Sequence, residues 1–191
     1  MILKNARHLL PEALDALVPL APMIGQYVFV DTGSSDNSPA YIRQRLPEAE
    51  IIVHTWCDNF SEARNRALDQ ANTSWALFLD ADERLAPESV PVLQQLLKQP
   101  LSIEGVVCRR ENLDLEGNPV SWDALTRVLS VSPSLRFTGA VHERPVMFEA
   151  SSMPNAPAKA RPLVVQSEPG LRLTHVATPP QTQTENPLSS Y

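Results

Sequence analysis

The sequence predicts an α/β domain with a mixed, mostly parallel sheet that has helices on both faces. Short apolar runs alternate with amphipathic stretches through the first half of the chain, which is typical of parallel strands joined by helical crossovers. The second half instead carries extended runs on either side of a Gly-Asn-Pro turn, which predicts an antiparallel hairpin. The chain has 191 residues, of which 43% are hydrophobic, so we expect one core and one domain.

In the first half, strands and helices are predicted to alternate. Residues 27–30 and 51–53 are short runs rich in β-branched and aromatic residues, which favour strands. Pro11 and Pro39 suit the first turn of a helix, where a missing N–H needs no partner. In chain order, we expect the end of a strand at 1–4, a helix over 11–20, a strand at 27–30, a helix from 38, a strand at 51–53, a helix from 61, a strand at 75–79 and a helix over 87–98.

The second half is predicted to add antiparallel strands to this sheet. Residues 151–162 are rich in Pro, Ala and Ser, and residues 177–191 are polar with several prolines. We therefore expect a mobile segment and a disordered tail there. The strands are expected at 105–109, at 125–131 after a turn at 116–119, and up to His175.

Composition and charge argue against several classes of function. The formal net charge of -6 argues against a nucleic-acid backbone or an anionic membrane as the main partner. Cys57 and Cys108 lack a CxxC or other metal-type spacing, so we expect reduced thiols without a catalytic role. No apolar run approaches the roughly 18 to 20 residues of a membrane-spanning helix, and the amino terminus carries no signal pattern. We therefore expect a cytoplasmic protein.

The most informative stretch is residues 75–83, an apolar run that ends on two carboxylates, Asp80 and Asp82. Such a run predicts a strand buried on both faces of a parallel sheet, and its carboxyl end is where ligands of open α/β sheets bind. The carboxylates taken alone are also compatible with a solvated cap or turn. Residues 31–36 add further carboxylates at the same expected edge, where repulsion favours a bound Mg²⁺ or Mn²⁺ ion.

Two polar segments are candidates for nucleotide binding. Residues 31–36 are compatible with a tight turn at Gly33 or with a nucleotide-binding loop. Arg64 and Asn65 open a predicted helix, where they suit either a surface salt bridge or a diphosphate. The phosphate motifs G-x-G-x-x-G and G-x-x-x-x-G-K-[ST] are absent, so neither a dinucleotide oxidoreductase nor a Walker-type ATPase is supported.

Three further candidate site residues lie in the second half of the chain: Gly139, Glu143 and His175. Gly139 permits close approach of a ligand but is also a common turn residue. Glu143 follows it as a carboxylate, and His175 at a strand end is compatible with a structural imidazole as well as a ligand. Their assignment depends on the order of motifs along the whole chain.

Taken in order, these motifs closely resemble a family 2 glycosyltransferase with the GT-A fold. The resemblance covers roughly residues 1–176, and in detail the chain is similar to the bacterial branch that modifies peptides and often carries helical repeats. It implies a three-layer α/β/α sandwich, the nucleotide-diphospho-sugar transferase fold, with a shortened first strand. The motifs lie at residues 2–5, 30–36, 56–65, 77–83, 139–143 and His175.

The resemblance also implies how a sugar donor would bind. Asp31 and Thr32 would lie against the nucleoside, and Asp80 would contact the ribose. Arg64 and Asn65 would lie near the base or the diphosphate. The implied donor is a nucleoside-diphosphate sugar, with a UDP-sugar as the first expectation.

For catalysis, the resemblance implies a metal-dependent reaction that inverts the anomeric carbon. Gly139 would line the donor sugar, and Glu143 would be the general base that takes the acceptor's proton. Asp82 and His175 would hold Mn²⁺ or Mg²⁺. The acceptor is unknown, and a peptide, a protein or a saccharide is considered.

Two other functions are compatible with parts of the sequence. A non-catalytic nucleotide-sugar-binding or scaffold domain would explain the shortened first strand. A sugar-phosphate nucleotidyltransferase shares a related sheet and metal chemistry, but its glycine-rich, basic amino-terminal loop is not visible here.

Overall fold

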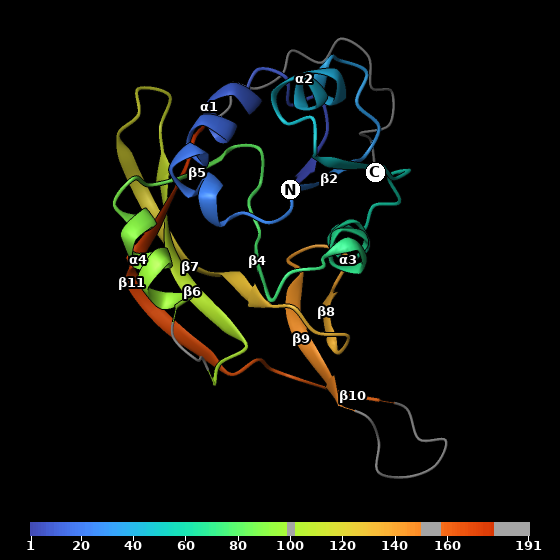
Figure 1. Ribbon diagram of the computed structural model, residues 1–191, viewed down its shortest axis with the longest axis vertical. Helices are drawn as coiled ribbons and strands as arrows, with labels where there is room; N and C mark the ends of the chain where they lie inside the picture. Colours follow the sequence, from blue (N-terminus) through green and yellow to red (C-terminus); the bar gives the residue numbers. More distant parts are fainter. Residues whose placement is uncertain (99–101, 150–157, 178–191) are drawn as a thin grey trace.

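The computed structural model describes residues 1–98, 102–149 and 158–177, and it confirms a mixed α/β domain (Figure 1). The strands form three sheets, of three, five and three strands. Within these residues, parallel pairing joins β1 (Ile2–Leu3), β2 (Val28–Asp31) and β3 (Glu50–Val53), and also β6 (Gly105–Leu113) and β11 (Val165–His175). The other strand pairs are antiparallel. The parallel part of the fold is therefore smaller than the sequence predicted.

The first sheet consists of three parallel strands in the order β1, β2, β3. These are β1 (Ile2–Leu3), β2 (Val28–Asp31) and β3 (Glu50–Val53), in agreement with the predicted strands. Helix α2 (Ser38–Arg45) connects β2 to β3, and α3 (Phe60–Gln70) follows β3. Asp31 is the last residue of β2, so the polar loop after it lies at the carboxyl edge of this sheet.

The predicted helix over 11–20 is divided in two. An α-helix, α1 (Leu10–Asp15), is followed by a 3-10 helix, η1 (Val18–Met23). Pro19 stands in the first turn of η1 and Pro22 inside it. Because proline lacks an N–H and clashes with the carbonyl four residues earlier, the α-helix does not continue through this segment.

The second sheet has five strands in the order β4, β7, β6, β11, β5. Strand β4 (Trp75–Leu77) pairs antiparallel with β7, so the predicted parallel strand at 75–79 is wrong in pairing and two residues too long. The predicted hairpin is confirmed, because β6 and β7 are antiparallel neighbours. The remaining strands and the helix that packs on β11 are β5 (Glu83–Leu85), β6 (Gly105–Leu113), β7 (Pro119–Ser130), β11 (Val165–His175) and α4 (Ser89–Leu96).

The third sheet extends away from the other two (Figure 1). It consists of β8 (Leu135–Thr138), β9 (Arg144–Glu149) and β10 (Lys159–Arg161), all antiparallel. Part of the segment expected to be mobile therefore forms a strand, in which Arg161 pairs with Glu104 at 2.7 Å. The other part of that segment, residues 151–157, and the tail from 178 lie outside the described residues.

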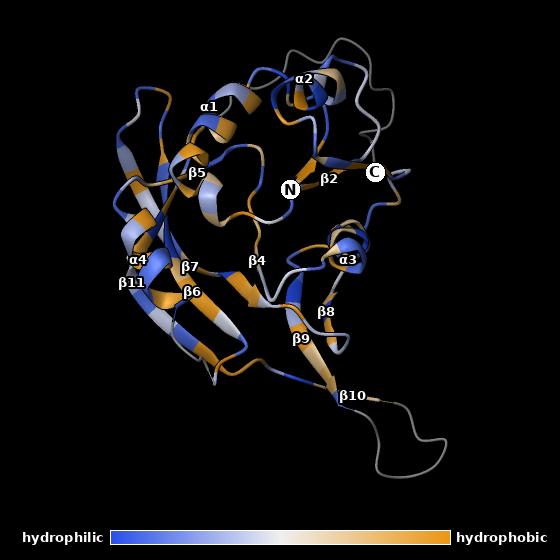
Figure 2. Ribbon diagram, viewed as in Figure 1, coloured by the Kyte–Doolittle hydropathy of each residue, from blue (hydrophilic) through white to orange (hydrophobic). Residues whose placement is uncertain are grey.

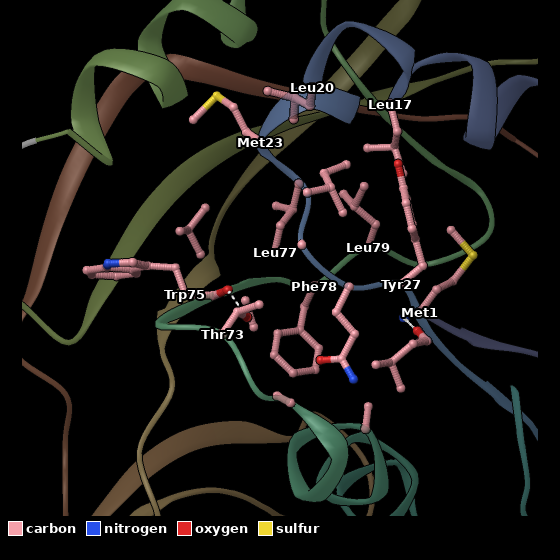
Figure 3. A pocket seen from close by; sticks show the side chains of 18 of the residues that line it. Met1, Leu17, Leu20, Met23, Tyr27, Thr73, Trp75, Leu77, Phe78 and Leu79 are labelled. Carbon is pink, nitrogen blue, oxygen red and sulfur yellow. Dashed lines mark hydrogen bonds between the residues drawn. The ribbon is translucent and has the colours of Figure 1, made fainter. Parts of the chain in front are cut away.

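An apolar cavity of about 370 Å³ lies between η1, β2, β4 and α4 (Figure 3). Figure 2 shows hydrophobic residues along β2 and β4, which lie on either side of it. The amino group of Met1 is buried at its edge and donates to the Val28 carbonyl at 2.9 Å. Burial, together with the charge of Arg64, lowers the pKa of this amine to about 5. None of the helices that the structure describes is both long and apolar enough to cross a bilayer.

Candidate functional site

A cleft of about 550 Å³ lies where the acidic run after β4 meets the ends of β1 and β11. Six of the nine residues proposed from the sequence line this cleft, and three do not. The lining residues are Thr32, Arg64, Asp80, Asp82, Glu143 and His175. The larger part of the predicted site is thus brought together from five separate segments of the chain.

Asp82 and His175 lie opposite each other in this cleft. His175 pairs with Glu83 across the β5–β11 ladder, and its Nε2 lies 3.3 Å from Asp82 Oδ2. Both side chains are about one-third exposed, at 34% each. Within the described residues, Asp82 makes no ion pair with Lys or Arg. An imidazole and a carboxylate without a competing cation therefore face the same space.

Asn112 fixes the orientation of the His175 ring. The Asn112 Oδ1 lies 3.0 Å from His175 Nδ1, while Asn112 Nδ2 donates to Ser121 and Asp123. These two donations assign the amide orientation, so the oxygen faces the imidazole and Nδ1 carries the proton. The other ring nitrogen, Nε2, then faces Asp82, and in the neutral ring it is the nitrogen that can ligate a metal ion. Sequence analysis gave Asn112 no role.

Arg64 is the centre of the charge network on the other side of the cleft. Its Nε donates to Glu143 at 2.6 Å, and its Nη2 donates to both oxygens of Asp80 at 3.1 and 3.2 Å. The residue is buried, with 4% of its surface exposed. The predicted alternative of a solvated surface salt bridge is therefore wrong, because this guanidinium positions two carboxylates inside the domain.

Asp80 is held ionised by two arginines. Burial alone would raise its pKa, but the charges and hydrogen bonds of Arg64 and Arg127 outweigh burial and lower the pKa to about 2. Arg127, from β7, reaches Asp80 Oδ2 at 2.9 Å. Sequence analysis did not single out Arg127, since an isolated arginine in a strand carries no motif.

Arg127 also pairs with a carboxylate that is fully buried. Glu83 has no exposed surface, and its Oε1 accepts from Arg127 at 2.5 Å and from Arg110 at 3.1 Å. Arg110 in turn pairs with Asp123 at 2.6 Å. Repulsion among Asp80, Asp82 and the carboxylates of residues 31–36 was expected to favour a bound cation, but two arginines already balance the charge of Asp80. Glu83 and Glu143 are paired with arginine as well.

The loop after β2 is organised by its own hydrogen bonds. Asp31 Oδ1 accepts from the Ser34 N–H at 3.0 Å and from its hydroxyl at 2.6 Å. Gly33 has a φ of 102°, a conformation that favours glycine. Thr32 donates to the Leu3 carbonyl at 3.1 Å and lines the cleft, whereas the buried Asp31 does not.

Asn65 and Gly139 lie behind the cleft, beside a separate hollow. The Asn65 amide accepts from the Phe137 N–H at 2.8 Å and donates to its carbonyl at 3.0 Å, so it pairs like a strand residue with β8. The Gly139 carbonyl accepts from Ser61, and the Ala140 carbonyl accepts from the N–H of Phe60. These contacts tie the start of α3 to the turn that carries Glu143, which explains how Arg64 and Glu143 meet.

Comparison with known proteins identifies the family of this chain. The family described as "Glycosyl transferase family 2" matches residues 1–148. The chain belongs to glycosyl transferase family 2. The family resemblance and the expected class of fold, a GT-A-type α/β domain, are thereby confirmed.

Relatives of this family 2 domain are longer proteins. A TPR repeat-containing protein of Synechococcus elongatus is 33% identical over 143 residues, which cover 75% of this chain and 34% of that protein. The SPbeta prophage-derived glycosyltransferase SunS of Bacillus subtilis is 25% identical over 126 residues, which cover 66% of this chain and 30% of SunS. The chain thus spans about a third of the length of these curated relatives.

Among solved structures, the chain is similar to the crystal structure of S. aureus TarS 1–349. The TM-score is 0.49 at 19% identity, over 63% of this chain and 36% of TarS. The complex of the same protein with UDP-GlcNAc gives a TM-score of 0.49 at 20% identity, over 63% and 35% of the two chains.

Proposed function

We propose that this family 2 domain transfers a sugar from a nucleoside-diphosphate sugar to the hydroxyl group of an acceptor. The observation that carries the proposal is the convergence of Asp82, His175, Asp80 and Glu143 in one cleft of about 550 Å³. This cleft offers a pair of metal-type ligands and a separate carboxylate suited to proton transfer. A UDP-sugar is the first donor to test, and the acceptor class is open among peptides, proteins and saccharides.

Asp82 and His175 would hold Mn²⁺ or Mg²⁺. The donor set fits, because the hydrogen bond between His175 and Asn112 leaves Nε2 as the free nitrogen beside Asp82. Two protein ligands leave coordination positions for diphosphate oxygens and water. A divalent ion bound there would act as a Lewis acid and neutralise the charge of the departing nucleoside diphosphate.

Glu143 is the proposed general base. Its Oε1 accepts from Arg64, and within the described residues no hydrogen bond reaches Oε2. The Arg64 bond therefore fixes the carboxylate and leaves one oxygen for the hydroxyl proton of an acceptor. One direct displacement at the anomeric carbon would invert its configuration.

The donor-binding roles are proposed for the residues that line the cleft. Thr32, which lines the cleft, would contact the nucleoside, and Asp80, which pairs with Arg64, would contact the ribose. Asp31 shapes the nucleoside loop through Ser34. Gly139 does not line the cleft, so it would affect the position of the donor sugar only indirectly, through the turn that carries Glu143. Asn65 is left out of the donor site, because its amide is committed to Phe137.

The decisive experiment is a transfer and hydrolysis assay of the full chain with a panel of nucleotide sugars and Mn²⁺ or Mg²⁺. Glu143→Gln should lower transfer by about 10² to 10⁴-fold and change donor affinity by less than about threefold. Glu149→Gln, at an exposed carboxylate that pairs with Arg161, is the matched control and should keep full activity. Wild-type transfer by Glu143→Gln would remove this residue from the mechanism.

The metal role and the stereochemistry are tested separately. Asp82→Asn should abolish the dependence of the rate on Mn²⁺, and a rate that survives both this change and EDTA would contradict the metal proposal. NMR of the product should show an inverted anomeric configuration. Donor binding in calorimetry without any turnover would instead favour the scaffold alternative, and release of pyrophosphate from a nucleoside triphosphate would favour a nucleotidyltransferase.

A further inference from the structure

A second group of metal-binding side chains lies at the connection between β3 and α3. It consists of His54, Cys57 and Glu62, whose ligand atoms all lie within 4.8 Å of one another. His54 follows the last residue of β3, and Glu62 is in the first turn of α3. None of the three lines the cleft of the proposed active site. The sequence gave Cys57 no such role, because the cluster combines three residue types and has no CxxC spacing.

The separations between the ligand atoms are close to those of a tetrahedral zinc site. Cys57 Sγ lies 3.8 Å from His54 Nε2 and 3.3 Å from Glu62 Oε2. With metal–ligand distances of about 2.3 Å for sulfur and about 2.0–2.2 Å for nitrogen and oxygen, tetrahedral angles place sulfur roughly 3.6 Å from each of the other two atoms. Shifts of a few tenths of an ångström would therefore bring the sulfur to tetrahedral distance from each of the other two ligand atoms, which lie within 4.8 Å of each other.

The backbone around the cluster is held by its own hydrogen bonds. The His54 N–H donates to the Asp31 carbonyl at 2.8 Å, which anchors the first ligand to β2. Asn59 caps α3 by accepting from the Glu62 N–H at 3.2 Å, which fixes the backbone of the third ligand. Between them, Asp58 adopts a φ of 55° and accepts from the Trp56 indole at 2.9 Å. Little ordering of the main chain would then be needed when an ion binds.

The chemistry of the three ligands selects the class of ion. A thiolate and an imidazole favour zinc and similar transition metals over Mg²⁺ or Mn²⁺, which prefer oxygen ligands. The thiol loses its proton to solvent when its sulfur becomes a ligand. This preference separates the cluster from Asp82 and His175, for which Mn²⁺ or Mg²⁺ is proposed.

We propose that His54, Cys57 and Glu62 form a second metal site, which binds one zinc-class ion with a fourth position open to water. The ion would join the end of β3 to the first turn of α3. Trp56 and Phe60 lie within this span, pack edge to face with ring centroids 4.8 Å apart, and line the cleft. Metal binding at this site would therefore stiffen one wall of the cleft.

The test is a titration of the reduced full chain with Co²⁺, followed by absorbance. A cobalt–thiolate bond gives a charge-transfer band in the near ultraviolet, which an ion at Asp82 and His175 cannot produce. We expect the band to saturate at one Co²⁺ per chain and to disappear when Zn²⁺ is added. Thermal unfolding should shift to higher temperature in the presence of Zn²⁺.

Variants identify the ligands. Cys57→Ser should abolish the band, and Glu62→Gln should weaken Co²⁺ binding at least tenfold. Asp58→Asn is the matched control, because it removes a neighbouring carboxylate, keeps the oxygen that Trp56 needs and suits the positive φ. It should bind Co²⁺ like the wild type.

Three results would overturn the proposal. These are the absence of a band at millimolar Co²⁺, an unchanged affinity in Glu62→Gln, and a band that survives Cys57→Ser. Glu62 and Cys57 are exposed, so both variants should fold even if substitution of the buried His54 does not. An effect on sugar transfer is not used as a readout, so the outcome is independent of the proposed function.

Discussion

Replacement of Arg127 by methionine should destabilise the domain strongly. Arg127 has a side chain that is 10% exposed, and it joins Glu83, which is 0% exposed, to Asp80. Methionine keeps much of the volume of the side chain but removes both ion pairs. Breaking a buried ion pair costs about 3–5 kcal/mol, because the partner charge stays buried.

This cost should lie in the lower half of that range. Glu83 would keep Arg110 at 3.1 Å and the Asp80 N–H at 3.1 Å, so its charge would not be left without any partner. Asp80 would likewise keep Arg64. We therefore expect a loss of about 3–4 kcal/mol in the free energy of unfolding, or roughly 6–16 °C in Tm for a domain of this size.

Urea unfolding followed by circular dichroism measures this loss. Arg136→Met is the matched control, because Arg136 pairs with Asp69 at 3.3 Å with both side chains about 40% exposed, and it should cost at most about 1 kcal/mol. The double variant Arg127→Met with Glu83→Gln should recover part of the loss, since it removes the buried charge. A loss below 1 kcal/mol for Arg127→Met alone would refute this account of the network.

Three further predictions concern the amino terminus, Asn65 and Asn112. The free energy of unfolding should rise by up to about 4 kcal/mol from pH 5 to pH 8. The reason is that the pKa of the Met1 amine is about 5 in the folded chain and 8.0 in the unfolded chain. Between these two values the unfolded chain binds a proton that the folded chain does not, so stability increases with pH. Acetylation of the amine should flatten this rise in urea titrations. Asn65→Ala should lower the free energy of unfolding by about 2–4 kcal/mol, because it leaves the N–H and the carbonyl of Phe137 unpaired. Calorimetry should find the donor affinity unchanged. Weaker donor binding would show that Asn65 belongs to the donor site. Asn112→Leu should weaken Mn²⁺ binding by about 10 to 100-fold in calorimetry, and unchanged binding would contradict its role in orienting His175.

The local elements were largely predictable from the sequence, whereas the pairing of strand β4 was not. Strands β2 and β3 and the β6–β7 hairpin follow from β-branched runs and turn residues, which act over a few positions. An apolar run such as residues 75–79 fits a buried strand of either direction. Its antiparallel pairing with β7 depends on residues more than fifty positions away, which no local pattern specifies.

The residues of the candidate site also differ in how far the sequence could predict their roles. Asp82 and His175 could be proposed because each lies in a recognisable motif, and the structure places them 3.3 Å apart. Arg127 and Asn112 lie in strands without any motif, and their roles arise only from strand pairing. Asn65 shows the opposite case, since it belongs to a motif but directs its amide to the backbone of β8.

Different acidic residues of the cleft contribute to the stability of the domain and to the proposed metal binding. Asp80, Glu83 and Glu143 are each paired with arginine, so their ionised forms contribute to the stability of the domain. Asp82 pairs with His175 and with no arginine or lysine within the described residues, and both side chains are partly exposed. Substitution of Asp82 should therefore leave stability nearly unchanged while it removes metal binding, and substitution of Arg127 should do the reverse at temperatures where the variant remains folded. A metal-binding loss in Asp82→Asn that simply followed a loss of folding would show that the two roles cannot be separated in this way.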